Sequence, residues 1–158
     1  MFGSSFLGID VGTSAVKAIE LSKSRGRVKV ENYGRVKTKA FYKEPFRTFE
    51  KGTFLLSVEE ISKAINAINK EAGIKAEKVN FSIPDFSTFF TSFKLPPMGK
   101  EEIPEAIRFE ARQHVPLPMS ELTLDWSVTE GQFNKTELKL LVVAIPDRVL
   151  SQYKEVAK

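Results

Sequence analysis

The stretch "FLGIDVGTSAVKAIEL" (residues 6–21) decides the fold of this chain, because two strand-like runs flank a Gly-Thr-Ser turn. Residues 6–11 alternate between faces, with Ile9 on the apolar face and Asp10 on the other. The run at 15–21 follows at once. The two runs therefore predict an antiparallel β-hairpin.

The residues after this hairpin extend it into an α/β domain. Residues 27–37 are rich in β-branched and aromatic side chains and predict a third strand. A helix is expected at 57–72, with a capping-box start and a glycine after its end. A strand at 78–84 comes after the helix, so it can pair parallel with an earlier strand. The first subdomain is therefore predicted over residues 1–85. The residues that mark the helix ends are Ser57, Glu60 and Gly73.

The second half of the chain has the order strand, helix, strand, strand. We expect these four elements at 88–96, 100–115, 122–130 and 136–146. Pro104 fits only the first turn of the helix, and Pro116 prevents its continuation. A second subdomain is predicted over 86–158, including the start of a final amphipathic helix. That helix has no C-cap before Lys158, and we expect that the chain is cut there.

Composition excludes several classes of function. The 158 residues carry 24 Lys and Arg and 20 Asp and Glu, with both signs interspersed in stretches such as 100–112, so nucleic acid binding is not expected. In residues 38–56, phenylalanines alternate with basic residues. Such a segment could stack nucleic-acid bases, but we expect a loop that its own phenylalanines pack onto the surface. The absence of cysteine excludes thiol chemistry and agrees with a cytoplasmic location. No apolar run is long enough to cross a membrane, and the N-terminus lacks the pattern of a secretory leader.

The turn of the first hairpin is the candidate binding site. Backbone amides and hydroxyls of Gly12, Thr13 and Ser14 can converge on phosphate oxygens. Asp10 would lie beside them and hold a hydrated Mg²⁺, and Lys17 would add positive charge if it faces the same way. The alternative is an ordinary hairpin in which the hydroxyls bond their own backbone.

No second catalytic constellation competes with this turn. His114 is the only histidine, and we expect a partly buried structural imidazole at the inner end of its helix. Trp126 alternates with apolar neighbours and is expected to anchor the core of the second hairpin.

Two stretches resemble known families. "GIDVGTSAVKAIEL" (8–21) resembles the first phosphate loop of the actin, sugar-kinase and heat-shock chaperone superfamily. "IPEAIRFEARQHVPLPMSELTLDWSV" (103–128) resembles a segment typical of the PilM family, the actin-like proteins of type IV pilus assembly. In the second stretch His114 replaces the usual aromatic residue. The positions that fit are Ala106, Glu110, Ala111, Pro116, Pro118, Leu122, Asp125 and Trp126.

The resemblance implies an α/β fold: a partial actin-like (ribonuclease-H-like) first lobe with an inserted strand-helix-strand-strand module, as in FtsA. It also implies a cytoplasmic adaptor and not an enzyme. PilM-like proteins bind ATP between two lobes and hold the N-terminal cytoplasmic tail of the inner-membrane protein PilN beside the inserted module. They link the inner-membrane platform to the pilus motor ATPases. The implied cofactor-binding positions are Asp10, Gly12, Thr13, Ser14 and Lys17, with Asp10 holding Mg²⁺ through water.

Full-length members of such families are more than twice as long as this chain, and their second phosphate loop and second lobe lie in the part absent here. We therefore expect that these 158 residues bind no ATP by themselves. Unpaired sheet edges would favour self-association.

Two other classes of protein share the first phosphate loop. An FtsA-like cell-division filament protein would add a C-terminal membrane helix, and a sugar-kinase-like phosphotransferase would need a base that no residue here supplies.

Overall fold

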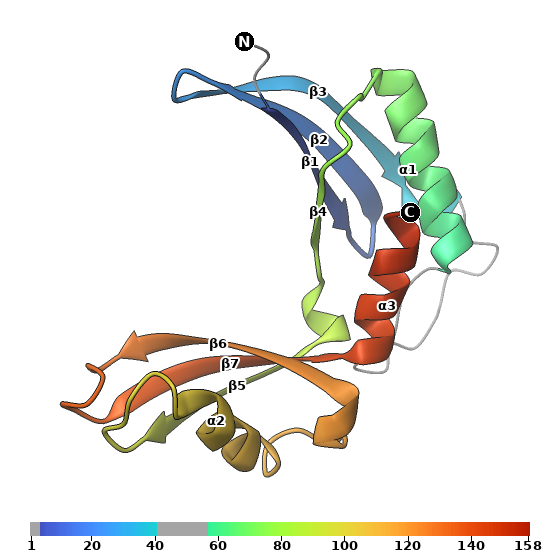
Figure 1. Ribbon diagram of the computed structural model, residues 1–158. Coiled ribbons are helices and arrows are strands. Elements are labelled where there is room, and N and C mark those ends of the chain that lie inside the picture. Colours follow the sequence, from blue (N-terminus) through green and yellow to red (C-terminus); the bar gives the residue numbers. More distant parts are fainter. Residues whose placement is uncertain (1–3, 41–56) are drawn as a thin grey trace. The chain divides into compact units, whose positions relative to one another are not determined.

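The computed structural model describes residues 4–40 and 57–158 (Figure 1). Expectations that concern residues 41–56, including most of the Phe-rich loop, lie outside the described residues. The described residues form two compact units. The first contains 4–40, 57–84 and 152–158, and the second contains 85–151.

A four-stranded sheet with the order β3-β2-β1-β4 forms the first unit. The predicted antiparallel meander is confirmed for its first three strands. The fourth strand runs parallel to β1, with Val79 opposite Leu7, which confirms the predicted parallel pairing. The strands are β1 (Ser4–Val11), β2 (Ala15–Ser24), β3 (Arg27–Lys37) and β4 (Val79–Ser82).

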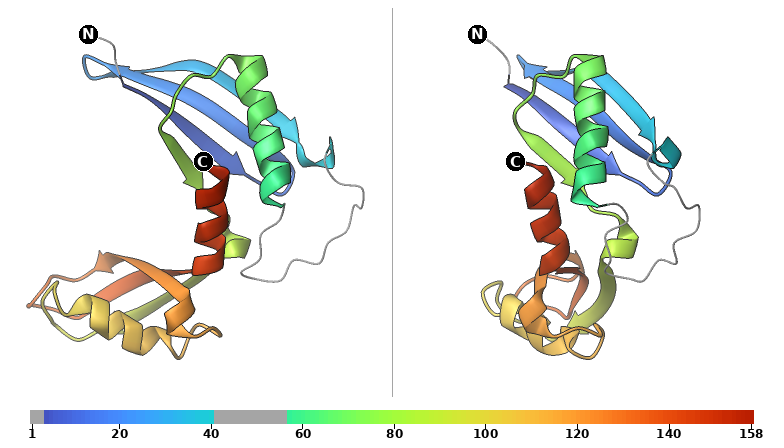
Figure 2. Two further views of the ribbon diagram at one scale, coloured as in Figure 1. Left: turned by 45° about the vertical axis from the view of Figure 1, so that its right-hand side comes forward. Right: turned by 90° about the vertical axis from the view of Figure 1, so that its right-hand side faces the viewer.

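Helix α1 (Val58–Ala72) covers one face of this sheet (Figure 2). Both hydrogen bonds of the predicted capping box between Ser57 and Glu60 are present, and Gly73 adopts the left-handed conformation that ends the helix. The helix packs closely on β3, since a Cβ atom at Gly34 would lie 2.5 Å from Cγ2 of Ile68. The buried residues of α1 are Ile61, Ala64, Ile65 and Ile68.

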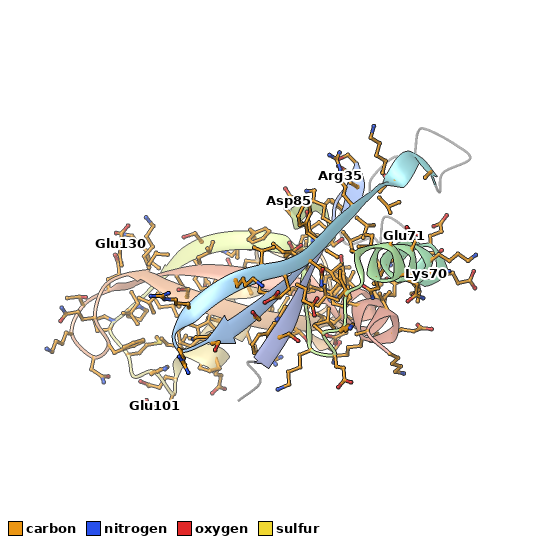
Figure 3. The ribbon with its side chains drawn as sticks, turned by 90° about the horizontal axis from the view of Figure 1, so that it is seen from above. Arg35, Lys70, Glu71, Asp85, Glu101 and Glu130 are labelled. Atoms are coloured by element: carbon orange, nitrogen blue, oxygen red, sulfur yellow. The ribbon has the colours of Figure 1, made fainter. Side chains whose placement is uncertain are left out.

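The opposite face of the first sheet is open. Side chains of alternate residues point to opposite faces of a sheet, and those of Ile19 and Tyr33 are 38% and 76% exposed. Figure 3 shows that the side chain of Arg35 lies on the side of the sheet away from α1. Ligands therefore have access to this face within the described part of the unit.

The second unit has the predicted order of strand, helix, strand, strand. Its sheet has the order β5-β7-β6 and is antiparallel throughout, with α2 (Ile103–Ala111) packed on one face. The core includes Phe93, Ile107 and Leu140, and Trp126 packs partly buried at its margin. The strands are β5 (Phe89–Leu95), β6 (Leu122–Glu130) and β7 (Leu138–Pro146). Short 3-10 turns lie at Thr38–Ala40, Asp85–Ser87 and Met119–Glu121.

Helix α2 is shorter than the predicted span of 100–115. The N–H groups of His114 and Val115 both donate to the carbonyl of Ala111 at 3.0 Å, which closes a tight turn after the last helical residue. Pro116 disfavours helical backbone at the residue before it, so the helix ends early.

The final helix, α3 (Asp147–Val156), starts in the second unit, and its residues from Gln152 onward belong to the first. Val149 and Tyr153 are buried, as the amphipathic pattern predicts. The Tyr153 ring lies 5.4 Å from that of Phe81 on β4.

Candidate functional site

The β1–β2 turn has free backbone donors at its tip. The Gly12 N–H donates to the Ala15 carbonyl at 3.0 Å, which closes the turn. Thr13 and Ser14 are exposed, and their N–H groups have no acceptor among residues 4–40 and 57–158. A concave set of such donors suits an anionic oxygen.

Thr38 fixes the other side of this turn. Its hydroxyl donates to the Thr13 carbonyl at 2.9 Å, and its N–H donates to the Ser14 carbonyl at 3.0 Å. The side chain is only 1% exposed. Both carbonyls are therefore held by β3 and its 3-10 extension, so the turn cannot rotate freely. Sequence reasoning missed this contact, because Thr38 lies 25 residues from Thr13.

Asp10 and Lys17 pair in register and share the open face of the sheet. The Lys17 ammonium donates to one oxygen of Asp10 at 2.9 Å, and the Ser82 hydroxyl donates to the other at 2.9 Å. The hydrogen bond from Lys17 lowers the pKa of Asp10 most, and the bond from Ser82 lowers it further. Asp10 is therefore ionised at neutral pH, but Lys17 neutralises much of its charge.

Gly12 keeps the space beside this carboxylate open. A Cβ atom at position 12 would lie 3.3 Å from the Ala15 carbonyl oxygen and 3.8 Å from Oδ2 of Asp10. The residue can therefore bring its backbone close to a ligand beside Asp10.

The open face extends this site across all four strands. A concave region of about 750 Å³ is lined by residues that include Asp10, Lys17, Tyr33, Arg35 and Asn80. Its charged groups lie at the β1–β2 end, next to the turn. The donors, the nearby cations and the ionised Asp10 suit a phosphate group with a hydrated Mg²⁺ held through water, provided that Lys17 turns toward the phosphate. The described residues contain no cluster of three or more side chains suited to direct metal ligation.

Tyr153 packs on Phe81, on the face of the sheet that α1 covers, and senses the charge of Asp10. Burial raises the pKa of its phenol, and the negative charge of Asp10 adds to that rise. The phenol is therefore neutral at physiological pH. No pattern in the sequence indicated this proximity, because α3 follows β1 by more than a hundred residues.

The His114 side chain packs on the edge of the second unit's core. The imidazole is 38% exposed and stacks on Phe93 with ring centroids 5.7 Å apart, which agrees with the predicted partly buried structural imidazole. Its Nε2 lies 3.8 Å from a carboxylate oxygen of Glu110. The early end of α2 explains the exposure, because the turn at 112–114 carries the ring to the surface.

The second unit presents a different kind of surface. On the face opposite α2, Phe90 on β5 is 55% exposed and Leu141 on β7 is 41% exposed. Phe90 pairs in register with Val143, and Leu141 pairs with Ser92 and Ser127. The result is a short apolar stripe bordered by Ser92 and Ser127 and, opposite Val143, by Asp125, and it offers apolar contacts to an extended peptide.

Comparison with known proteins identifies the family. A family model described as type IV pilus assembly protein PilM matches residues 8–157. This chain belongs to the PilM family. A chain of a solved PilM-PilN type IV pilus biogenesis complex has the same fold, with a TM-score of 0.76 at 21% identity. The match covers 96% of this chain and 43% of that chain, so the present chain spans less than half of its relative.

A second solved structure has a more distant likeness of fold. It is the cytoplasmic domain of EpsL, an inner-membrane component of the type II secretion system of Vibrio cholerae. The TM-score is 0.57 at 12% identity, and the match covers 97% of this chain and 53% of that chain. With the PilM match, it confirms the predicted actin-like α/β fold with its inserted module.

Proposed function

We propose that this chain is part of a cytoplasmic adaptor of type IV pilus assembly that holds the N-terminal tail of a PilN-like inner-membrane protein. The observation that supports this role is the PilM family match over residues 8–157. It favours an adaptor over an FtsA-like filament protein or a sugar-kinase-like phosphotransferase. The adaptor is not an enzyme, is peripheral to the inner membrane through its partner, and connects that partner to the pilus motor ATPase. Among the described residues, no helix combines the length and apolar character needed to span a bilayer.

The second unit supplies the surface for the tail. Phe90 and Leu141 are exposed on the sheet face opposite α2, and an extended apolar peptide laid along this face would cover both. Peptides that bind in this way gain affinity from apolar side chains that fit between strand residues. One end of this sheet carries two ion pairs, Lys94 with Glu137 and Lys139 with Glu130. The apolar tail therefore contacts the opposite end of the sheet.

Titration of a fluorescently labelled N-terminal PilN-like peptide tests this role by anisotropy. The substitution Leu141→Glu should weaken binding by at least about tenfold, because it places a charge against apolar peptide side chains. The matched control is Phe109→Glu, which changes a residue on α2 that is 67% exposed and lies on the opposite face. It should leave binding unchanged. No saturable binding to the unmodified chain would contradict the adaptor role.

The first unit supplies the first phosphate loop of a nucleotide site in the longer protein. Thr13 and Ser14 offer N–H groups at the turn that have no acceptor in the described part of the chain, and Gly12 lets the backbone approach the ligand. Lys17 binds phosphate oxygens, and Asp10 holds Mg²⁺ through water. In a full-length protein of the PilM family, adenosine contacts and a second phosphate loop would come from the part that this chain does not match.

Self-association is a further part of the proposal. Within residues 4–40 and 57–158, strands β3, β4, β5 and β6 lie at the edges of the two sheets, and such edges pair with other chains. Sedimentation velocity over a range of concentrations should show a rising average mass. A constant monomer mass would contradict this expectation.

A further inference from the structure

The β2–β3 hairpin carries the excess positive charge of the chain. Residues 22–37 contain six Lys and Arg and one Glu, a net charge of +5, whereas the whole chain has a net charge of +4. The prediction that both signs are interspersed is therefore wrong for this hairpin, although it holds for 100–112. The cationic residues are Lys23, Arg25, Arg27, Lys29, Arg35 and Lys37.

The cations near the hairpin tip are exposed and mostly unpaired. Every residue from 23 to 31 is exposed. Lys29 pairs with Glu31 at 2.7 Å. Within the part of the chain that the structure describes, Lys23, Arg25 and Arg27 have no carboxylate partner. Their charge is therefore available to an external anion.

Apolar side chains are exposed among these cations. Val28 is 64% exposed and Val30 is 49% exposed on β3. The tip itself is a tight turn, in which Arg25 and Gly26 both have positive φ, at 49° and 77°. This geometry matches the strand twist and gives a narrow, well-defined tip. The tip therefore combines unpaired cations with accessible apolar groups.

A purely structural explanation covers only part of this pattern. Lys and Arg on an edge strand prevent pairing with other chains, which accounts for charges along β3. It does not account for Arg25 in the turn, nor for Lys23 on β2, which has a strand on each side. Nucleic acid binding would call for several stacking aromatics, whereas Tyr33 is the only aromatic residue of the hairpin.

We infer that the β2–β3 hairpin contacts an anionic phospholipid surface. Clusters of four or more Lys and Arg are attracted to anionic headgroups, with about a fivefold gain in binding for each cation. Val28 and Val30 would insert among the headgroups. Their exposure therefore favours a bilayer over a soluble acidic protein as the partner. The contact is independent of the proposed peptide tail, because it uses only residues of the first unit.

Vesicle co-sedimentation of the whole chain tests this contact. The chain should bind vesicles of phosphatidylcholine with phosphatidylglycerol, less so as salt increases, and should not bind pure phosphatidylcholine. The triple variant Lys23→Gln, Arg25→Gln, Arg27→Gln should lower the partition coefficient by about a hundredfold. The matched control Lys63→Gln, Lys75→Gln, Lys78→Gln removes the same charge from exposed positions of the first unit. It should change the coefficient by no more than about threefold.

Three results would overturn the inference. They are equal binding to neutral vesicles, an equal loss in both triple variants, and tighter binding to soluble polyglutamate than to anionic vesicles. Thermal unfolding of each variant verifies that the fold is retained, since all six side chains are exposed.

Discussion

Asp10 lies one residue before the end of β1, and Lys17 and Ser82 each donate a hydrogen bond to one of its carboxylate oxygens. In this state the carboxylate and the ammonium balance each other. A bound phosphate would attract Lys17 away from Asp10 and leave the carboxylate to a hydrated cation. The ion pair is therefore the resting state of the proposed phosphate site.

The substitution Lys17→Met should raise the pKa of Asp10, because the hydrogen bond from Lys17 is the largest cause of its low value. A carboxyl whose pKa is lower in the folded state stabilises the fold above its unfolded pKa, and this stabilisation is lost as pH falls through the folded pKa. In the Lys17→Met variant, the pKa of Asp10 in the folded state moves closer to its value in the unfolded state. Asp10 therefore contributes less to the stability of the fold at neutral pH. NMR titration of the Asp10 carboxyl carbon measures the shift.

The substitution Ser82→Ala should raise the same pKa by less, since the bond from Ser82 is a smaller cause. Lys63→Met removes an exposed lysine elsewhere in the same unit and serves as the control. An Asp10 titration that is identical in the Lys17→Met variant and the unmodified chain would contradict the ion pair.

The sequence predicts the side chains of this site only where they are local. Alternation within β1 places Asp10 on the face opposite Ile9, whereas the contact of Asp10 with Lys17 follows from the register of β2 on β1. The contact of Ser82 with Asp10 spans 72 residues and depends on the register of β4 on β1. No local periodicity specifies that register, so this contact was not predicted.

At the scale of elements, the 3-10 turn that follows β3 is hydrogen-bonded to the β1–β2 turn. Thr38 holds the carbonyls of both Thr13 and Ser14. This arrangement leaves the N–H groups at the tip exposed. The turn is therefore supported by a third strand and is not an isolated hairpin end.

The substitution Thr38→Val should lower the free energy of unfolding by about 1 kcal/mol, because it removes a hydroxyl bond and leaves the Thr13 carbonyl without that partner. Urea denaturation measures the change. Thr38→Ser keeps the hydroxyl and should recover most of the hydrogen-bond contribution. No loss in Thr38→Val together with a loss in Thr38→Ser would show that the methyl group, not the hydroxyl, stabilises the turn.

Elements with local end markers were the most predictable. Ser57, Glu60 and Gly73 mark α1 within two residues, because capping and left-handed termination depend on neighbouring residues. Helix α2 ended earlier than its apolar pattern predicts, because the tight turn onto Ala111 competes with the helix. The charge of the β2–β3 hairpin was present in the sequence but was obscured by averaging over the whole chain.

At the scale of the whole molecule, this chain spans 43% of the solved PilM-PilN complex chain that it matches. A nucleotide held only by the β1–β2 turn gains a few hydrogen bonds that water already supplies. Calorimetric titration of the 158-residue chain should therefore detect no ATP binding at millimolar nucleotide. Micromolar affinity would show that these residues form a complete site.

The most direct test of the adaptor role is NMR mapping of the chain with the N-terminal cytoplasmic peptide of a PilN-like protein. The account predicts saturable shifts of backbone amides in β5 and β7, centred near Phe90 and Leu141, with little change in α1. Shifts confined to α1 and β3, or no saturable shift at all, would contradict it.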